Sequence, residues 1–154
     1  MKRICNTAHA YMIIGVLSGL YYRELTKAKH FTGDSQLGVV HTHILALGML
    51  FFLIVLVLEK QFTLSASRLY RWFFWIYNAG LILTVAMMTL HGTLTVLGQP
   101  VSEAIPGIAG LGHIVLTVGL VLLFVMLGKR IAAGAVPSDP AAPQPSDTAP
   151  VPAG

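Results

Sequence analysis

The chain has 154 residues, of which 55% are hydrophobic and only 10% are charged, and its formal net charge is +4. Soluble domains carry charge on roughly a quarter of their residues, so this composition excludes an ordinary water-soluble domain and favours a protein surrounded by lipid. A basic balance is also typical of nucleic-acid-binding proteins. Here, however, the basic residues lie at the ends of apolar segments, so we expect no nucleic-acid partner.

Four apolar segments follow one another along the chain, at residues 8–22, 37–58, 72–97 and 105–127. Each of the last three has the ~20 residues that an α-helix needs to cross the hydrocarbon core of a bilayer, whereas the first is shorter. Aromatic residues mark segment ends, as at membrane interfaces; they are Tyr21, Tyr22, Tyr70, Trp72 and Trp75. We therefore predict an all-α fold, an integral membrane four-helix bundle over residues 1–130.

The basic residues are divided unevenly between the two sides that four crossings create. Seven fall on the side of the two termini, at Lys2, Arg3, Lys60, Arg68, Arg71, Lys129 and Arg130. Three fall on the opposite side, at Arg23, Lys27 and Lys29. Because positively charged loops are retained in the cytoplasm, both termini are predicted to be cytoplasmic.

Residues 131–154 have a different composition, rich in Ala, Pro, Ser and Asp, and they contain six of the eight prolines. Such a segment buries too little apolar surface to offset the entropy lost on ordering. We predict a disordered Pro/Ala-rich tail that begins at residue 131.

Four of the six histidines fall inside the predicted membrane segments, at His41, His43, His91 and His113. Counted from the side opposite the termini, they share a depth of about 6–12 Å below the hydrocarbon surface, at about 1.5 Å per residue. Ionisable side chains inside a membrane are costly and usually serve a function. The other two, His9 and His30, lie outside this layer and need no special explanation.

Imidazole is a common ligand of zinc, copper and iron. The layer contains no Asp, Glu or Cys, and the acids nearest to it, Glu24, Glu59 and Glu103, lie at segment ends. Calcium, magnesium and diiron-carboxylate sites, which need oxygen ligands, are therefore not expected. Haem iron needs only one or two axial histidines and an apolar slot, so the pattern predicts haem b as the cofactor.

The spacing of His41 and His43 indicates that they serve different sides of one helix. At about 100° per residue their side chains point about 200° apart, so they cannot both ligate one metal from an intact helix. The spacing favours an interpretation that pairs His41 of one protomer with His43 of the next, which requires an oligomer. A second pairs His43 with His113 inside one protomer and leaves His91 beside the haem.

Several motifs resemble those of a family of short four-helix bacterial membrane proteins of unknown function. They are Tyr22-Arg23-Glu24-Leu25-Thr26-Lys27, Val40-His41-Thr42-His43, Glu59-Lys60-Gln61-Phe62 and Gly107-Ile108-Ala109-Gly110-Leu111-Gly112-His113-Ile114. The resemblance covers about residues 1–130. It implies a multi-pass protein of the bacterial cytoplasmic (plasma) membrane.

The run His41-Thr42-His43 is also distantly similar to a His-x-His pair in the catalytic subunit of haem-copper oxidases, which resembles three four-helix arcs. That similarity implies a homotrimer in which His41 and His43 of neighbouring protomers hold a haem. The His-x-x-x-Tyr motif of the oxidase copper site does not occur in this sequence. The similarity therefore extends neither to a copper site nor to oxygen reduction.

These observations predict a membrane protein that binds haem b and serves electron transfer or redox or gas sensing, with a quinol or a redox protein as partner. If it is an enzyme, it is a haem-dependent oxidoreductase. Two alternatives remain. One is a small membrane transporter, in which an intramembrane histidine replaces the usual buried carboxylate. The other is an accessory or assembly subunit of a respiratory complex, in which the histidines are structural.

The charge distribution makes a testable prediction of topology. A reporter that is active only outside the cytoplasm should be inactive when fused to the C-terminus and active when inserted at Gly33, in the first loop. The physical reason is the excess of basic residues on the terminal side. Activity of the C-terminal fusion would overturn the predicted orientation.

Overall fold

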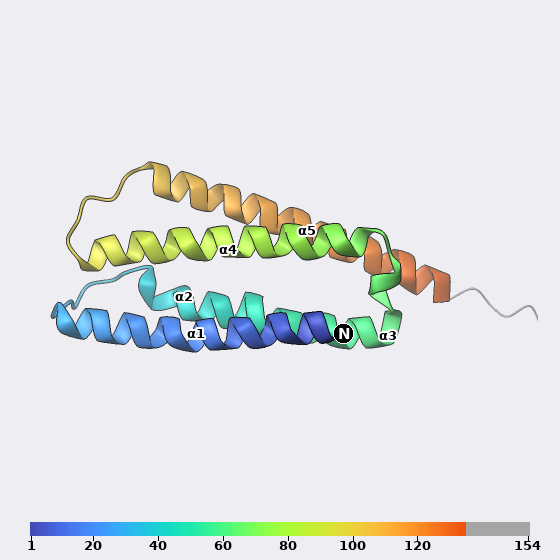
Figure 1. The fold of residues 1–154 in the computed structure, drawn as a ribbon. Helices are drawn as coiled ribbons and strands as arrows, with labels where there is room; N and C mark the ends of the chain where they lie inside the picture. The colour runs from blue at the N-terminus through green and yellow to red at the C-terminus, as the bar shows by residue number, and fades with distance from the viewer. Residues whose placement is uncertain (135–154) are drawn as a thin grey trace, which may run out of the picture.

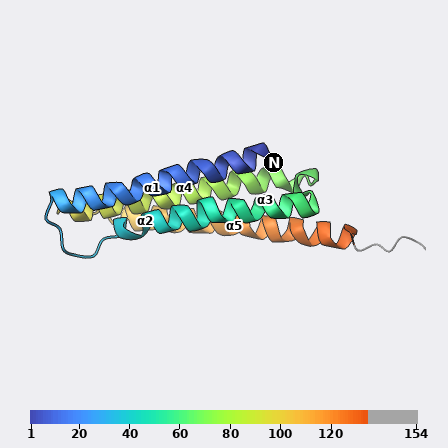
Figure 2. The ribbon, with the colours of Figure 1, turned by 90° about the horizontal axis from the view of Figure 1, so that it is seen from below.

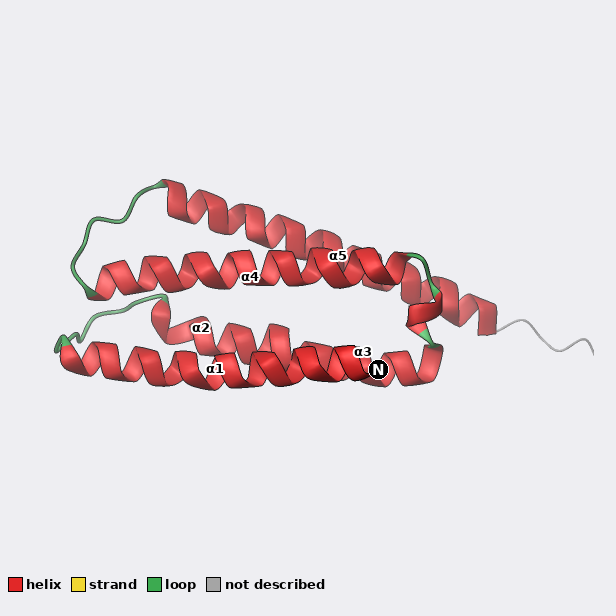
Figure 3. Ribbon diagram, in the orientation of Figure 1, coloured by secondary structure: helices red, strands yellow, loops and turns green. Residues whose placement is uncertain are grey.

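The structure, a computed structural model, describes residues 1–134, and all regular structure in that range is helical (Figure 3). The elements are α1 (Lys2–Ala28), α2 (Leu37–His43), the π-helical η1 (Ile44–Leu50), α3 (Phe51–Phe62), the 3-10 turn η2 (Leu64–Ala66), α4 (Leu69–Val96) and α5 (Ala104–Gly134). α2, η1 and α3 follow one another without a break and form one helix of 26 residues. The predicted all-α architecture is confirmed.

Each of the four long helices is long and apolar enough to cross a membrane. The largest difference from prediction concerns the first, which has 27 residues instead of the short segment 8–22. Its added turns contain Lys, Arg and Glu, which are good helix formers and whose long side chains reach the membrane surface. α5 continues to Gly134, past the predicted boundary at residue 130. The rest of the predicted tail lies outside the described residues.

Consecutive long helices run antiparallel, as Figure 1 shows. The α1–α2 and α4–α5 connections lie at one end, and the N-terminus, η2 and the end of α5 lie at the other. α1 packs along the α2–η1–α3 helix, α4 packs along α5, and α2 contacts α4 between the two hairpins (Figures 1 and 2). All seven basic residues assigned to the terminal side by the sequence therefore lie at one end of the bundle, which we call the basic end.

A buried carboxylate holds the turn between α3 and α4. Glu59 is only 6% exposed, and its side chain accepts hydrogen bonds from the backbone N–H of Ser65, at 2.8 Å, and from the Ser65 hydroxyl. Thr63 ends α3 in the left-handed conformation, with φ of 50°. These bonds satisfy the buried carboxylate, which would otherwise be costly.

Glycines allow α4 and α5 to approach at backbone distance. A Cβ on Gly112 would lie 2.5 Å from the Thr84 hydroxyl, and one on Gly119 would lie 2.9 Å from the Cα of Tyr77. Close approach of this kind is how helices associate inside a membrane, where lipid removes the hydrophobic driving force. Towards the α4–α5 connection the two helices diverge (Figure 1).

The packing of α4 against α5 yields a prediction on stability. Gly119→Ala should lower the thermal stability of the protein in detergent, because the added methyl meets the backbone of α4, and overpacking costs about 1–3 kcal/mol. Gly128→Ala is the matched control on the same helix, since nothing lies within 4 Å of its added Cβ. The control should be unchanged or more stable by up to about 1 kcal/mol. Equal behaviour of the two variants would contradict the close contact.

Candidate functional site

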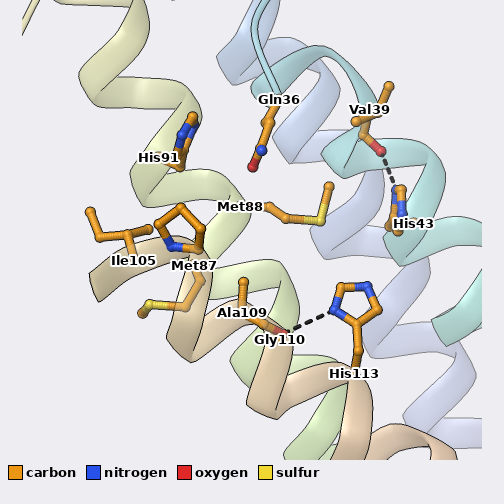
Figure 4. Close-up of a pocket in the computed structure, with 11 residues that line it drawn as sticks. Gln36, Val39, His43, Met87, Met88, His91, Ile105, Ala109, Gly110 and His113 are labelled. Atoms are coloured by element: carbon orange, nitrogen blue, oxygen red, sulfur yellow. Dashed lines mark hydrogen bonds between the residues drawn. The ribbon is translucent and has the colours of Figure 1, made fainter. Parts of the chain in front are cut away.

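Three of the four predicted intramembrane histidines line one pocket between α2, α4 and α5. The pocket has a volume of about 460 Å³. Figure 4 shows His43 on α2, His91 on α4 and His113 on α5 around it. The remaining lining residues are mostly apolar, namely Gln36, Val39, Met87, Met88, Ile105, Pro106, Ala109 and Gly110. The tertiary structure thus gathers three histidines from three helices, the outer two being His43 and His113.

His43 and His113 are held in the same way by their own helices. The Nδ1 of His43 lies 2.9 Å from the carbonyl oxygen of Val39, and the Nδ1 of His113 lies 2.9 Å from that of Ala109. Both carbonyls belong to the residue four positions earlier (Figure 4).

This geometry determines the tautomer of both rings. A carbonyl oxygen only accepts hydrogen bonds, so Nδ1 must be the donor, and in the neutral ring Nε2 then carries a free lone pair. A histidine that ligates a metal through one nitrogen usually donates its other N–H to a carbonyl or carboxylate. His43 and His113 therefore have the orientation and tautomer of ligands that bind through Nε2.

His91 occupies a different position in the pocket. It is half-buried, and its Nδ1 is buried with no hydrogen-bond partner. A neighbouring pocket of about 620 Å³, which includes Tyr22 and Asp34, shares Gln36, Val39 and His91 with the first. His91 therefore lies where the histidine pocket meets a more polar cavity near the α1–α2 connection, and its ring retains hydrogen-bonding capacity.

His41 does not join the other three histidines. It points towards α1, where an added Cβ on Gly19 would lie 3.7 Å from its Cβ and Cγ. Its Nδ1 is buried without a partner, and its Nε2 lies 3.4 Å from the Thr42 hydroxyl. The sequence correctly placed His41 and His43 on different sides of the helix. α1 of the same chain covers the His41 side. His9 and His30 are exposed and lie outside the pocket, as predicted.

The π-helical η1 begins directly after His43, and the sequence analysis missed it. π-helical segments are rare in proteins, and those that do occur are often found at functional sites. Two contacts hold this one: the Tyr77 hydroxyl donates to the Leu47 carbonyl at 2.9 Å, and Gly48 leaves room for the Tyr11 ring, which an added Cβ would meet at 2.5 Å. Gly48, in the middle of the second apolar segment, is the local feature of the sequence that could have indicated it.

Other lining residues could have been found from helical spacing. Gln36, Val39 and His43 lie at positions i, i+3 and i+7, which share one face of a helix. No group of three or more His, Cys, Asp or Glu side chains within residues 1–134 is close enough to hold a bare metal ion. Two nitrogen ligands in an apolar pocket suit a metal that brings most of its own ligands, as haem iron does.

The chain matches one protein family. The sequence pattern of the family described as "Protein of unknown function (DUF2871)" matches residues 1–130. No curated protein and no solved structure matches the chain.

The hydrogen bonds of the two rings can be measured directly. In protein labelled with ¹⁵N-histidine, His43 and His113 should show the Nδ1–H tautomer at neutral pH, because each Nδ1 faces a carbonyl oxygen. His9 and His30, which lie outside the pocket, serve as internal references, and His43→Gln and His113→Gln assign the signals. An Nε2–H tautomer at both positions would contradict the proposed orientation.

Proposed function

The chain belongs to the DUF2871 family, whose description names no activity, and we propose that it is a membrane protein that binds haem b through histidine axial ligands. The observation that carries the proposal is the pair His43 and His113. Both line one apolar pocket, and both use Nδ1 to bond their own helix. Their Nε2 lone pairs are thereby left free for iron.

The pocket suits a large apolar cofactor. Its volume of about 460 Å³ lies in the range of small-molecule sites, roughly 300–1,000 Å³. Its lining includes Met87, Met88 and Ile105, which favour a hydrophobic macrocycle. Cys5 is the only cysteine, so the sequence has no Cys-x-x-Cys-His motif for covalent attachment, which favours haem of the b type.

His43 and His113 are the better ligand pair within one protomer. α2 and α5 present them to the same pocket, whereas His41 lies against α1 of its own chain. The alternative, with His41 of one protomer and His43 of the next in a homotrimer, requires a neighbouring haem to displace or bypass α1. The first arrangement requires no particular oligomer.

Two histidine ligands favour electron transfer as the chemistry. Bound haem would supply one-electron exchange at its iron, and His43 and His113 together would hold it in a form suited to electron transfer rather than to oxygen binding. The unpartnered Nδ1 of His91 offers a hydrogen bond at the edge of the pocket, where it would hold a polar group of the cofactor or tune its potential. The proposed partner is a quinol or redox protein at the bacterial plasma membrane.

A visible spectrum of protein purified from haem-replete cells tests this proposal. The wild type should show the Soret and sharp α and β bands of a low-spin, six-coordinate haem. His43→Ala and His113→Ala should each lose that spectrum, because each removes one axial ligand. His41→Ala and His91→Ala should keep it, and His9→Ala, outside the pocket, is the control.

Co-expression of two single variants decides between the two ligand pairs. Co-expression of His43→Ala with His113→Ala should restore no low-spin haem if both ligands come from one protomer. If His41→Ala loses the spectrum, and co-expressed His41→Ala and His43→Ala regain part of it, the intersubunit pairing holds instead. A colourless wild-type protein would contradict haem binding and favour a transporter or an accessory subunit.

A further inference from the structure

A second pocket lies between α1 and α4, towards the basic end, and we call it the α1–α4 groove. It has a volume of about 610 Å³. The groove is lined by Arg3, Asn6, Thr7, Ala10, Tyr11, Ile14, Asn78 and Ile82. The histidine pocket shares none of these residues.

The lining of the groove changes from charged to apolar along α1. Arg3 lies in the first turn, Asn6 and Thr7 lie one turn further, and Ala10 and Ile14 follow. At about 1.5 Å per residue, the step from Arg3 to Thr7 covers about 6 Å, close to the thickness of one interfacial layer of a bilayer. Along α1 the groove therefore offers a cation, then neutral polar side chains, then apolar side chains. This order matches the phosphate, the glycerol backbone and the acyl chain of a phospholipid.

Arg3 is positioned to bind an anion. Its guanidinium carbon lies 4.3 Å from the centre of the Phe74 ring and 5.0 Å from that of Trp75. Aromatic stacking orients a guanidinium and leaves its N–H groups free, and their fork matches the oxygens of a phosphate. Among residues 1–134 the only ion pair is Arg23 with Glu24, at 3.9 Å, so no carboxylate there forms an ion pair with Arg3.

The deepest polar groups of the groove are already paired with protein. The Tyr11 hydroxyl donates to Oδ1 of Asn78 at 2.7 Å, and Nδ2 of Asn78 donates to the Phe74 carbonyl at 2.6 Å. These bonds satisfy most of their capacity at the depth where a quinone ring would need donors. An acyl chain, which needs none, fits this depth better, against the exposed side chain of Ile82.

From this arrangement we infer that the α1–α4 groove binds one anionic phospholipid. Its phosphate lies on Arg3, its polar backbone lies beside Asn6 and Thr7, and an acyl chain runs past Ile14 and Ile82. The other basic residues gathered at this end attract anionic lipid to the same surface. The inference goes beyond the proposed function and does not depend on haem.

Native mass spectrometry of the full chain in mild detergent tests the inference, with phosphatidylglycerol as the probe and phosphatidylcholine of the same chains as the uncharged comparison. The wild type should retain one phosphatidylglycerol in preference to phosphatidylcholine. Arg3→Ala should weaken retention by at least about tenfold, because a charge-assisted hydrogen bond to phosphate is lost. Lys2→Ala is the matched control: it removes an equal charge one residue away, outside the groove, and should cost no more than about fivefold.

A second variant tests the groove without touching Arg3. Ile82→Trp should fill the apolar part and abolish the bound lipid, whereas Val118→Trp, on the exposed face of α5, should not. Helicity measured by circular dichroism confirms that each variant folds. The inference would be overturned if Arg3→Ala and Lys2→Ala lost equal amounts of bound lipid, or if the wild type retained both lipids equally. It would also be overturned if Ile82→Trp retained as much phosphatidylglycerol as the wild type.

Discussion

The backbone contact between α4 and α5 determines where the bundle is tight and where it is open. Gly112 and Gly119 bring the two helices together at Thr84 and Tyr77. From there α5 diverges from α4 towards the connecting loop (Figure 1). Because lipid supplies no hydrophobic force between helices, such contacts depend on small residues. The space left beyond the contact is the histidine pocket, and α2 forms its remaining wall.

The two proposed sites orient their binding side chains through different contacts. His43 and His113 are oriented by carbonyls of their own helices, so they need no partner helix to set the tautomer. Arg3 is oriented by aromatic rings of another helix, Phe74 and Trp75. In both cases one part of the side chain is held by the protein while its binding atoms remain free. The first arrangement leaves a lone pair for a metal, and the second leaves donors for an anion.

Some buried polar atoms are paired within the protein, and others are not. Glu59, Tyr11 and Asn78 have hydrogen-bond partners within the protein, and they link turns and helices. The Nδ1 atoms of His41 and His91 and the hydroxyl of Thr84 have none. An unpaired buried polar atom is costly; at His91, which lines a pocket, a ligand would offset that cost. His41 lies against α1 and Thr84 against Gly112 of α5, so neither lines the histidine pocket.

The sequence by itself determined that the chain has four apolar helices in up-and-down order, although not the full length of the first, because hydrophobic length is a local property. The shared membrane depth of the four histidines stays a prediction from the sequence. The family match supports the same extent, residues 1–130. Helical phase also separated His41 from His43. Only the tertiary structure decided that His43 lies in one pocket with His91 and His113. Helical spacing gives the direction in which a side chain points, but not which helix lies on that side. It also decided the π-helical η1, because Tyr77 and Tyr11, distant in sequence, contact Leu47 and Gly48 only once the helices have packed.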